Sequence, residues 1–275
     1  MIKYNFHSHS EFCDGKEKLE DYINAAISKG FKAFGFSPHS PLPFENEWSI
    51  KEENLDSYIK TAQELKNKYK GKIDIYTGIE LDYIPGYSDD FEKITKNGRF
   101  DYRIGSVHLV RIKNSPETWF IDGKEEFFFT GIDKHFGGDV KKAVEAFYMQ
   151  TIEMLQTQKF DIIGHFDKVK MHNKERLFST KENWYKNLVN ITLQEIKKQN
   201  RIVELNTRGV YTGKSNEYFP SEEILYECKK LEIPLMISTD SHMPEQIDNH
   251  FAEAYYMLKN IGFTKVVTPF FEAEL

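Results

Sequence analysis

The chain has 275 residues, of which 40% are hydrophobic and 29% charged, and its net charge is -6 at pH 7. This globular balance excludes a mainly disordered chain, and the length predicts a single domain over residues 1–275. The acidic charge argues against nucleic acid as a partner, because a phosphate backbone needs a basic protein face.

The amino-terminal segment MIKYNFHSHS has no basic stretch followed by an apolar one, as a signal peptide would. No apolar run approaches the roughly 18 residues of a membrane span, so we expect a cytoplasmic protein without a membrane partner. Cys13 and Cys228 are the only cysteines. Neither a disulfide framework nor a thiolate zinc site is therefore predicted, and the oligomeric state has no signal in the sequence.

Segments with the pattern of strands and of helices alternate along the whole chain. Helical spacing is seen in two sets of apolar residues, Leu19, Tyr22, Ile23, Ala26 and Ile27, and Val140, Val144, Phe147, Tyr148 and Leu155. Alternation of this kind predicts parallel βα units. Short apolar runs typical of buried strands cover residues 2–6, 33–37, 73–79, 102–107, 161–164, 201–205, 235–238 and 265–268.

Six to eight such units favour an α/β fold of the closed or distorted (β/α) barrel type, with a doubly wound open sheet as the alternative. The connection 109–138 is much longer than the few residues typical of such loops. We expect it to be an insertion that acts as a lid or determines specificity.

Residues that can bind metals stand where the predicted strands end. His7 and His9 follow the first strand, and the period of two along a strand turns both imidazoles to the same side. The carboxyl ends of parallel barrel strands meet at one rim, where active sites of this architecture form. The other candidates at strand ends are His39, Glu80, His108, His165, Asp240 and His242, and Asp14 follows in the turn CDG.

A lone HxH pair is commonly just a pair of surface histidines, so the recurrence carries the inference. Six of the nine histidines stand at strand ends, which packing alone rarely requires. Imidazole and carboxylate suit zinc, iron or manganese, and a carboxylate such as Glu80 can bridge two ions. The sequence therefore predicts a metal cluster with nitrogen and oxygen ligands.

Several other polar residues have two interpretations. Lys168, Lys170 and Arg208 follow predicted strands and are candidates for binding a phosphate group, or they are solvated surface charges. Glu204 and Asn206 in the segment VELN either support metal ligands from behind or simply satisfy hydrogen bonds.

The ordered motifs resemble the PHP (polymerase and histidinol phosphatase) family over residues 7–242. They are HSHSEFCDG, SPHS at His39, GIELDY at Glu80, GSVH at His108, GHFD at His165 and STDSH near the end. The resemblance implies a distorted (β/α)7, TIM-like barrel with a trinuclear site. By the same resemblance, the first ion is held by His7, His9, Glu80 and Asp240, the second by Glu80, His108 and His165, and the third by Asp14, His39 and His242.

Within the family, the long insertion and the segments GHFDKVK and ELNTRG are similar to the monofunctional histidinol phosphatases of histidine biosynthesis. This implies hydrolysis of a small phosphate monoester, L-histidinol phosphate, to L-histidinol and phosphate. The chemistry expected is in-line attack by a hydroxide that bridges the first two ions, which share Glu80 as a ligand. Asp240, His242 or a water on the metal would then protonate the leaving alkoxide.

Three alternatives stay open at this point. One is another activity of the same family, such as a protein-tyrosine phosphatase or a different small-molecule phosphoesterase. A second is an amidohydrolase-type enzyme that cleaves C–N bonds, although such barrels commonly bridge their ions with a lysine where this chain has Glu80. The third is a noncatalytic module that binds metal only for stability.

Overall fold

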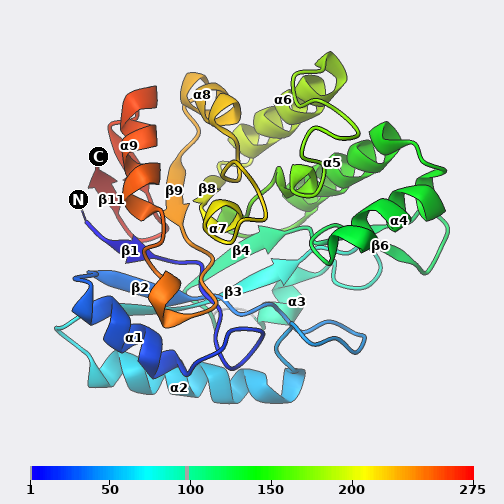
Figure 1. Cartoon of the computed structure of the whole chain (residues 1–275). Coiled ribbons are helices and arrows are strands. Elements are labelled where there is room, and N and C mark those ends of the chain that lie inside the picture. The colour runs from blue at the N-terminus through cyan, green and yellow to red at the C-terminus, as the bar shows by residue number, and fades with distance from the viewer. Residues whose placement is uncertain (1, 97–98) are drawn as a thin grey trace.

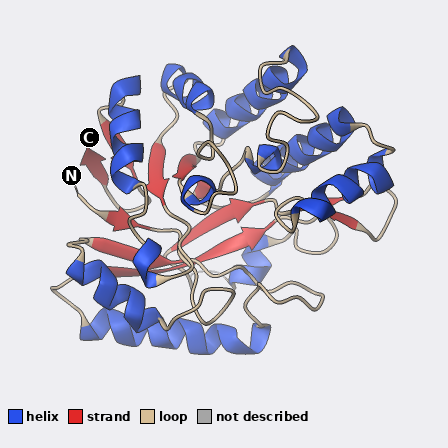
Figure 2. Cartoon of the chain, in the orientation of Figure 1, coloured by secondary structure: helices blue, strands red, loops and turns tan. Residues whose placement is uncertain are grey.

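The computed structural model describes residues 2–96 and 99–275, and its centre is a seven-stranded parallel sheet. The strands follow one another in chain order around the sheet, with helices outside them (Figure 1, Figure 2). They are β1 (Tyr4–Asn5), β2 (Ala33–Phe36), β3 (Asp74–Asp82), β4 (Tyr102–Ser106), β7 (Ile162–Ile163), β8 (Ile202–Asn206) and β9 (Leu235–Ser238).

The sheet closes into a barrel between its first and last strands. Ser8 and Ser241 form a parallel bridge just beyond β1 and β9, and the His9 amide donates to the Ser241 carbonyl at 2.8 Å. Strands β2, β8 and β9 are buried along their whole length, as expected for parallel strands covered on both faces. The predicted (β/α)7 barrel is confirmed, and the doubly wound open sheet is excluded.

The helices cover the outside of the barrel and turn one apolar face toward it. In α1 the buried residues Leu19, Tyr22, Ile23 and Ala26 recur at helical spacing. Both ends of the chain lie on the same side of the molecule (Figure 1). No helix in the described ranges is long and apolar enough to cross a membrane. The helices are α1 (Leu19–Ser28), α2 (Leu55–Lys68), α3 (Phe91–Thr95), α4 (Glu125–Phe136), α5 (Val140–Thr157), α6 (Asn183–Lys198), α7 (Arg208–Tyr211), α8 (Glu222–Lys230) and α9 (Phe251–Ile261), with 3-10 turns η1 (Glu52–Asn54), η2 (Lys168–Lys170) and η3 (Pro244–Gln246).

The prediction that residues 265–268 form a strand of the barrel is wrong. Residues 265–268 contribute β10 (Lys265–Val267), which pairs antiparallel with β11 (Glu272–Glu274) in a separate two-stranded sheet. The barrel is already closed by β1 and β9, so it offers no edge for an eighth strand. Instead, the turn of this hairpin inserts Phe270, whose ring stacks on Tyr76 at 3.8 Å and also contacts Phe6.

An aromatic cluster fills the barrel interior below the level of Glu80. Tyr76 and Glu80 lie on the same face of β3 because side chains repeat every two residues. The Tyr102 ring packs on Phe6 at 5.6 Å, and its hydroxyl donates to the Phe6 carbonyl at 2.6 Å. Gly78 has no side chain because an added Cβ would lie 2.2 Å from the Tyr102 ring. Polar ligands are therefore confined to the upper end of the barrel.

The long connection 109–138 is folded rather than an extended loop. It forms the hairpin β5 (Leu109–Arg111) and β6 (Thr118–Phe120), followed by α4. The Ile121 amide donates to the carbonyl of His108 at 3.0 Å, which fixes the end of the hairpin against a strand end of the barrel. This connection therefore contributes residues to the upper rim.

Candidate metal centre

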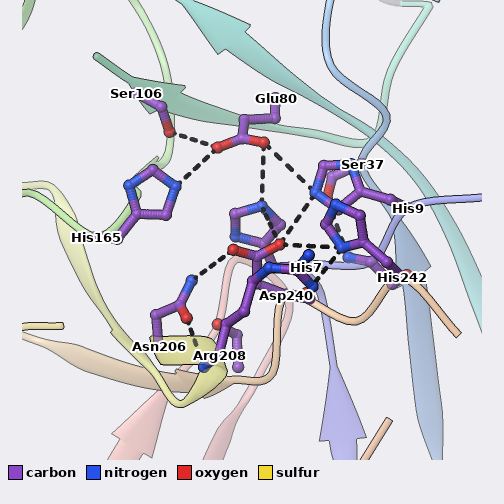
Figure 3. A network of polar contacts seen from close by, with 12 residues as sticks. His7, His9, Ser37, Glu80, Ser106, His165, Asn206, Arg208, Asp240 and His242 are labelled. Carbon is purple, nitrogen blue, oxygen red and sulfur yellow. Dashed lines mark hydrogen bonds and ion pairs between the residues drawn. The ribbon is translucent and has the colours of Figure 1, made fainter. Parts of the chain in front are cut away.

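All nine residues expected as metal ligands converge at the carboxyl ends of the strands. Within each of four groups, the candidate ligand atoms lie within 4.8 Å of one another. Strand β3 contributes Glu80, and the segments that follow β1, β2, β4, β7 and β9 contribute the rest. Figure 3 shows Glu80 together with His7, His9, His165, Asp240 and His242. The groups are His9, Asp14, His39 and His242; His7, His9 and Asp240; His7, Glu80 and His165; and His39, Glu80 and His108.

Glu80 lies between two sets of imidazoles. Its Oε2 is 3.2 Å from His7 Nε2 and 3.1 Å from His39 Nδ1. Its Oε1 is 3.1 Å from His165 Nε2 and accepts a hydrogen bond from Ser106 Oγ at 2.7 Å (Figure 3). The two oxygens of one carboxylate thus face different histidines, which is the arrangement a bridging ligand needs.

Two of the candidate ligands have backbones that L residues seldom adopt. His165 has φ 23° and Asp240 has φ 48°. Such conformations persist where the surroundings impose them and are common at functional sites. Gly164 precedes His165, and a Cβ added there would lie 2.5 Å from Ser106 Oγ, so the strand end has room only for glycine. The backbone at His165 and Asp240 is therefore held in an unfavourable conformation, and their side chains point into the cluster.

The turn carrying Asp14 is pressed against the HxH segment. A Cβ on Gly15 would lie 2.3 Å from the Ser10 amide nitrogen, so the turn can approach this closely only with glycine. Asp14 Oδ2 is consequently 3.1 Å from His242 Nε2, and Asp14 Oδ1 is 3.6 Å from His9 Nδ1. This brings residues from opposite ends of the chain into one group.

Carboxylates lie behind two of the imidazoles. His7 Nδ1 hydrogen-bonds Glu204, and His108 Nδ1 hydrogen-bonds Asp82. Histidine ligands of metals usually donate their second ring nitrogen to such a partner, which fixes the ring orientation. Burial would lower the pKa of His108, but Asp82 raises it to about 9.

The donor atoms fit a metal cluster. Several buried nitrogen and oxygen atoms that face the cluster have no hydrogen-bond partner among the residues that the structure describes, although buried polar atoms normally have one. Burial would raise the pKa of Glu80, but His7 and His39 hold it well below its usual range, so this carboxylate is charged. Nitrogen and oxygen donors of this kind suit zinc, iron or manganese. The unpartnered atoms are His7 Nε2, His9 Nε2, Asp14 Oδ1, His39 Nδ1 and Glu80 Oε2.

A cavity of about 140 Å³ opens above these residues. A larger hollow of about 760 Å³ lies along the loop before α2, and another of about 800 Å³ is lined by residues such as Arg201 and Lys265. None of the nine candidate ligands lines either of them. We therefore consider the smaller cavity to be the site, because candidate metal ligands line it. Its walls are Asp14, His39, Trp48, Glu80, His108, Phe120, Asp122, Lys168, Arg208, Lys214, Asp240 and His242.

Two of the three predicted phosphate-binding residues reach the cavity. Lys168 and Arg208 line it, and the Arg208 guanidinium also donates to the Asp240 carbonyl at 2.8 Å. Burial would lower the pKa of Lys168, but Asp122 at 2.7 Å raises it, so the ammonium stays charged.

Lys170 does not line the cavity. Its ammonium is 2.8 Å from Asp167 and 2.9 Å from Glu217, and it is buried with them. The turn η2 explains the difference, because residues two apart in a 3-10 helix point in different directions.

Some residues of the site were not among the predictions. Asp82 could have been identified from the sequence, because it follows Glu80 by two positions and so lies on the same face of the strand. Trp48, Phe120, Asp122 and Lys214 come from connections whose path the sequence pattern does not fix. The Trp48 and Phe120 rings stack at 5.1 Å, which joins the loop before α2 to the inserted hairpin at the cavity.

Comparison with known proteins gives a consistent result. The chain is 29% identical over 281 residues to a Schizosaccharomyces pombe protein named probable histidinol-phosphatase, covering 94% of this chain and 87% of that one. It is 28% identical over 257 residues to the histidinol-phosphatase of Bacillus subtilis, covering 88% and 94%.

The fold is also that of a solved structure. The crystal structure of Lactococcus lactis histidinol phosphate phosphatase, complexed with zinc, L-histidinol and phosphate, superposes with a TM-score of 0.71 at 21% identity, covering 99% of both chains. The PHP domain family matches residues 5–208, which is most of the chain. The chain therefore belongs to the PHP domain family.

Proposed function

We propose that this chain is a metal-dependent phosphatase that hydrolyses L-histidinol phosphate to L-histidinol and phosphate in histidine biosynthesis. The observation that carries the proposal is one cavity with candidate metal ligands on one side and cationic side chains on the other. Two relatives that align over most of this chain bear the name of this activity. The zinc, L-histidinol and phosphate bound to the Lactococcus lactis neighbour correspond to a metal and the two products of the reaction.

The proposed cofactor is a cluster of three divalent ions, zinc, iron or manganese. His7, His9, Glu80 and Asp240 would hold the first ion, Glu80, His108 and His165 the second, and Asp14, His39 and His242 the third. His39 Nδ1 lies 3.1 Å from Glu80 Oε2, so His39 lies between the ligands of the third ion and those that share Glu80. When bound, such ions lower the pKa of water and neutralise charge on a transferring phosphoryl group.

The phosphate group would be oriented by Lys168 and Arg208, and Lys214 adds a third cation to the cavity wall. A guanidinium fork and ammonium groups are the side chains that recognise phosphate oxygens. We leave Lys170 out of this set because Asp167 and Glu217 already hold it. Asp240 and His242 both line the cavity, so they are the residues we propose to supply a proton to the leaving alkoxide.

A substrate comparison tests this function. Phosphate release should be measured from L-histidinol phosphate, a phosphotyrosine peptide and a generic aryl phosphate with the zinc-loaded and manganese-loaded protein. We expect the highest kcat/KM for L-histidinol phosphate. Equal or faster turnover of the peptide would instead assign the chain to protein-tyrosine phosphatases of the same family.

A further inference from the structure

Glu204 is a fully buried carboxylate on β8 that belongs to none of the four ligand groups. Its Oε1 accepts hydrogen bonds from the Ser238 hydroxyl and from His7 Nδ1. Its Oε2 accepts from the His165 amide at 2.9 Å and from Asn206 Nδ2 at 3.2 Å. One side chain therefore accepts four hydrogen bonds in the barrel interior.

These four partners require an acceptor at position 204. The His165 amide can only donate. Asn206 is held in one orientation because its Nδ2 also donates to Asp240 Oδ2 at 3.1 Å while its Oδ1 accepts from the Arg208 amide at 2.9 Å (Figure 3). Of the four, the Ser238 hydroxyl can turn to accept, and His7 Nδ1 can accept only if its proton moves to Nε2. An uncharged amide in place of the carboxylate would present its NH₂ either to the fixed donors of His165 and Asn206 or to His7 Nδ1, which would then have to accept.

The bond from His7 to Glu204 also decides which nitrogen of His7 carries a proton. A neutral imidazole has one N–H, and donation from Nδ1 leaves the lone pair on Nε2. Nε2 is the atom that faces the cluster, 3.2 Å from Glu80 Oε2 and 3.8 Å from Asp240 Oδ1. A ligand nitrogen must present a lone pair to the ion, so His7 needs an acceptor behind it.

We infer that Glu204 is a positioning residue that fixes the tautomer of His7 and holds His7, His165 and, through Asn206, Asp240 in register for metal binding. His165 depends on this contact because its backbone lies at φ 23° and its amide is tied to Glu204. The inference rests on the metal cluster proposed above.

The test is Glu204→Gln, which keeps the shape and removes one acceptor. If the glutamine NH₂ faces His7, the proton of His7 moves to Nε2 and blocks ligation. If it faces His165, two buried donors oppose each other. We expect zinc affinity to fall by about 10- to 100-fold, the range seen when such partners of metal ligands are lost, with a retained circular dichroism spectrum.

A matched control is Asp167→Asn, another buried carboxylate near the end of β7. Asp167 accepts from the Ser221 amide at 3.0 Å and pairs with Lys170 at 2.8 Å, and in the described ranges it contacts no candidate ligand. The Asp167→Asn substitution should lower the melting temperature while leaving zinc affinity unchanged. A Glu204→Gln protein with wild-type zinc affinity would overturn the inference and leave the phosphatase proposal standing, whereas a wild-type protein that binds no zinc would overturn both.

A second measurement does not depend on the folding of the variant. In zinc-loaded wild-type protein with labelled histidine, NMR should detect a proton on Nδ1 of His7 that exchanges slowly with solvent, because the group is buried against Glu204. A His7 whose proton is on Nε2 in that spectrum would contradict the inference.

Discussion

The two halves of the candidate metal centre are built differently. In the buried half, comprising His7, His9, Glu80, His108, His165 and Asp240, side chains are 0–4% exposed, as for His7 and Asp240. In the rim half, comprising Asp14, His39 and His242, exposure reaches 12% for His242 and 31% for Asp14. His7 and His108 of the buried half are backed by carboxylates, whereas His242 Nδ1 lies 3.1 Å from the Asp240 carbonyl.

This difference indicates a division of roles. Ligands that are buried and fixed from behind lose little freedom when they bind an ion, so the buried half should hold its ions more tightly. The rim half lies where the cavity opens and faces the substrate side. We therefore expect ions in the buried half to be retained and the rim ion to exchange.

The largest effect is expected from Glu80→Gln, which changes the residue proposed to be shared by the first and second ions. Glutamine keeps one acceptor oxygen but replaces the other by an NH₂ group that cannot bind an ion. We expect kcat to fall by more than about 100-fold, beyond the range for residues that only support ligands, with the fold retained. Phosphate release and circular dichroism measure the two quantities. Unchanged activity would refute the catalytic cluster, and Glu64→Gln on the exposed face of α2 is the control.

A smaller effect should separate Lys168 from Lys170, which lie in the same turn. Lys168→Met removes a charged hydrogen-bond donor from the cavity, so kcat/KM should fall by about 10- to 100-fold, the equivalent of about 1.5–3 kcal/mol. Lys170→Met leaves Asp167 buried without its cation and should destabilise the fold by about 3 kcal/mol with KM unchanged. Kinetics and thermal unfolding of both variants distinguish them. A reversal of the two outcomes would restore Lys170 as a substrate ligand.

Asp14→Asn tests the rim half alone. We expect about tenfold weaker binding of one ion, because an amide oxygen is a poorer ligand than a carboxylate, while the remaining ions stay bound. Equilibrium dialysis with zinc measures this directly. Loss of all ions from the variant would show that the two halves are one cooperative site.

The smallest effect concerns pH. Burial would lower the pKa of His7 and His108, but Glu204 and Asp82 raise both, that of His108 to about 9. Protonation therefore stabilises the metal-free protein below about pH 6.5, the unfolded value, and this contribution is lost as pH rises toward 9. Zinc must displace these protons, so its affinity should rise over the same window. Melting curves of metal-free protein and zinc titrations between pH 6.5 and 9 check both signs, and a pH-independent zinc affinity would contradict them.

Much of this site follows from the sequence because strand ends of a parallel barrel converge. His7, Glu80 and Asp240 are far apart along the chain, yet each stands where an apolar run ends, and that position alone predicts that they meet. The barrel class was predicted from the alternation of strand-like and helical segments, and its (β/α)7 form from the family resemblance.

The remainder depends on contacts that periodicity does not encode. Residues 265–268 have the composition of a barrel strand, but closure between β1 and β9 leaves them to seal the interior with Phe270. The stacking of Trp48 on Phe120 joins the loop before α2 to the hairpin β5–β6, and tertiary packing sets their relative position. The sequence indicates Glu204 as a possible support for metal ligands, but its four hydrogen-bond partners could not be predicted from it.

Metal-dependent hydrolysis is tested most directly by counting bound zinc and measuring phosphate release from L-histidinol phosphate in the same samples during stepwise chelation. We predict three ions per chain at full activity, loss of the first ion from the rim half, and no turnover once the buried half is empty. Readdition of zinc should restore activity. Full turnover by the metal-free protein would contradict the central claim.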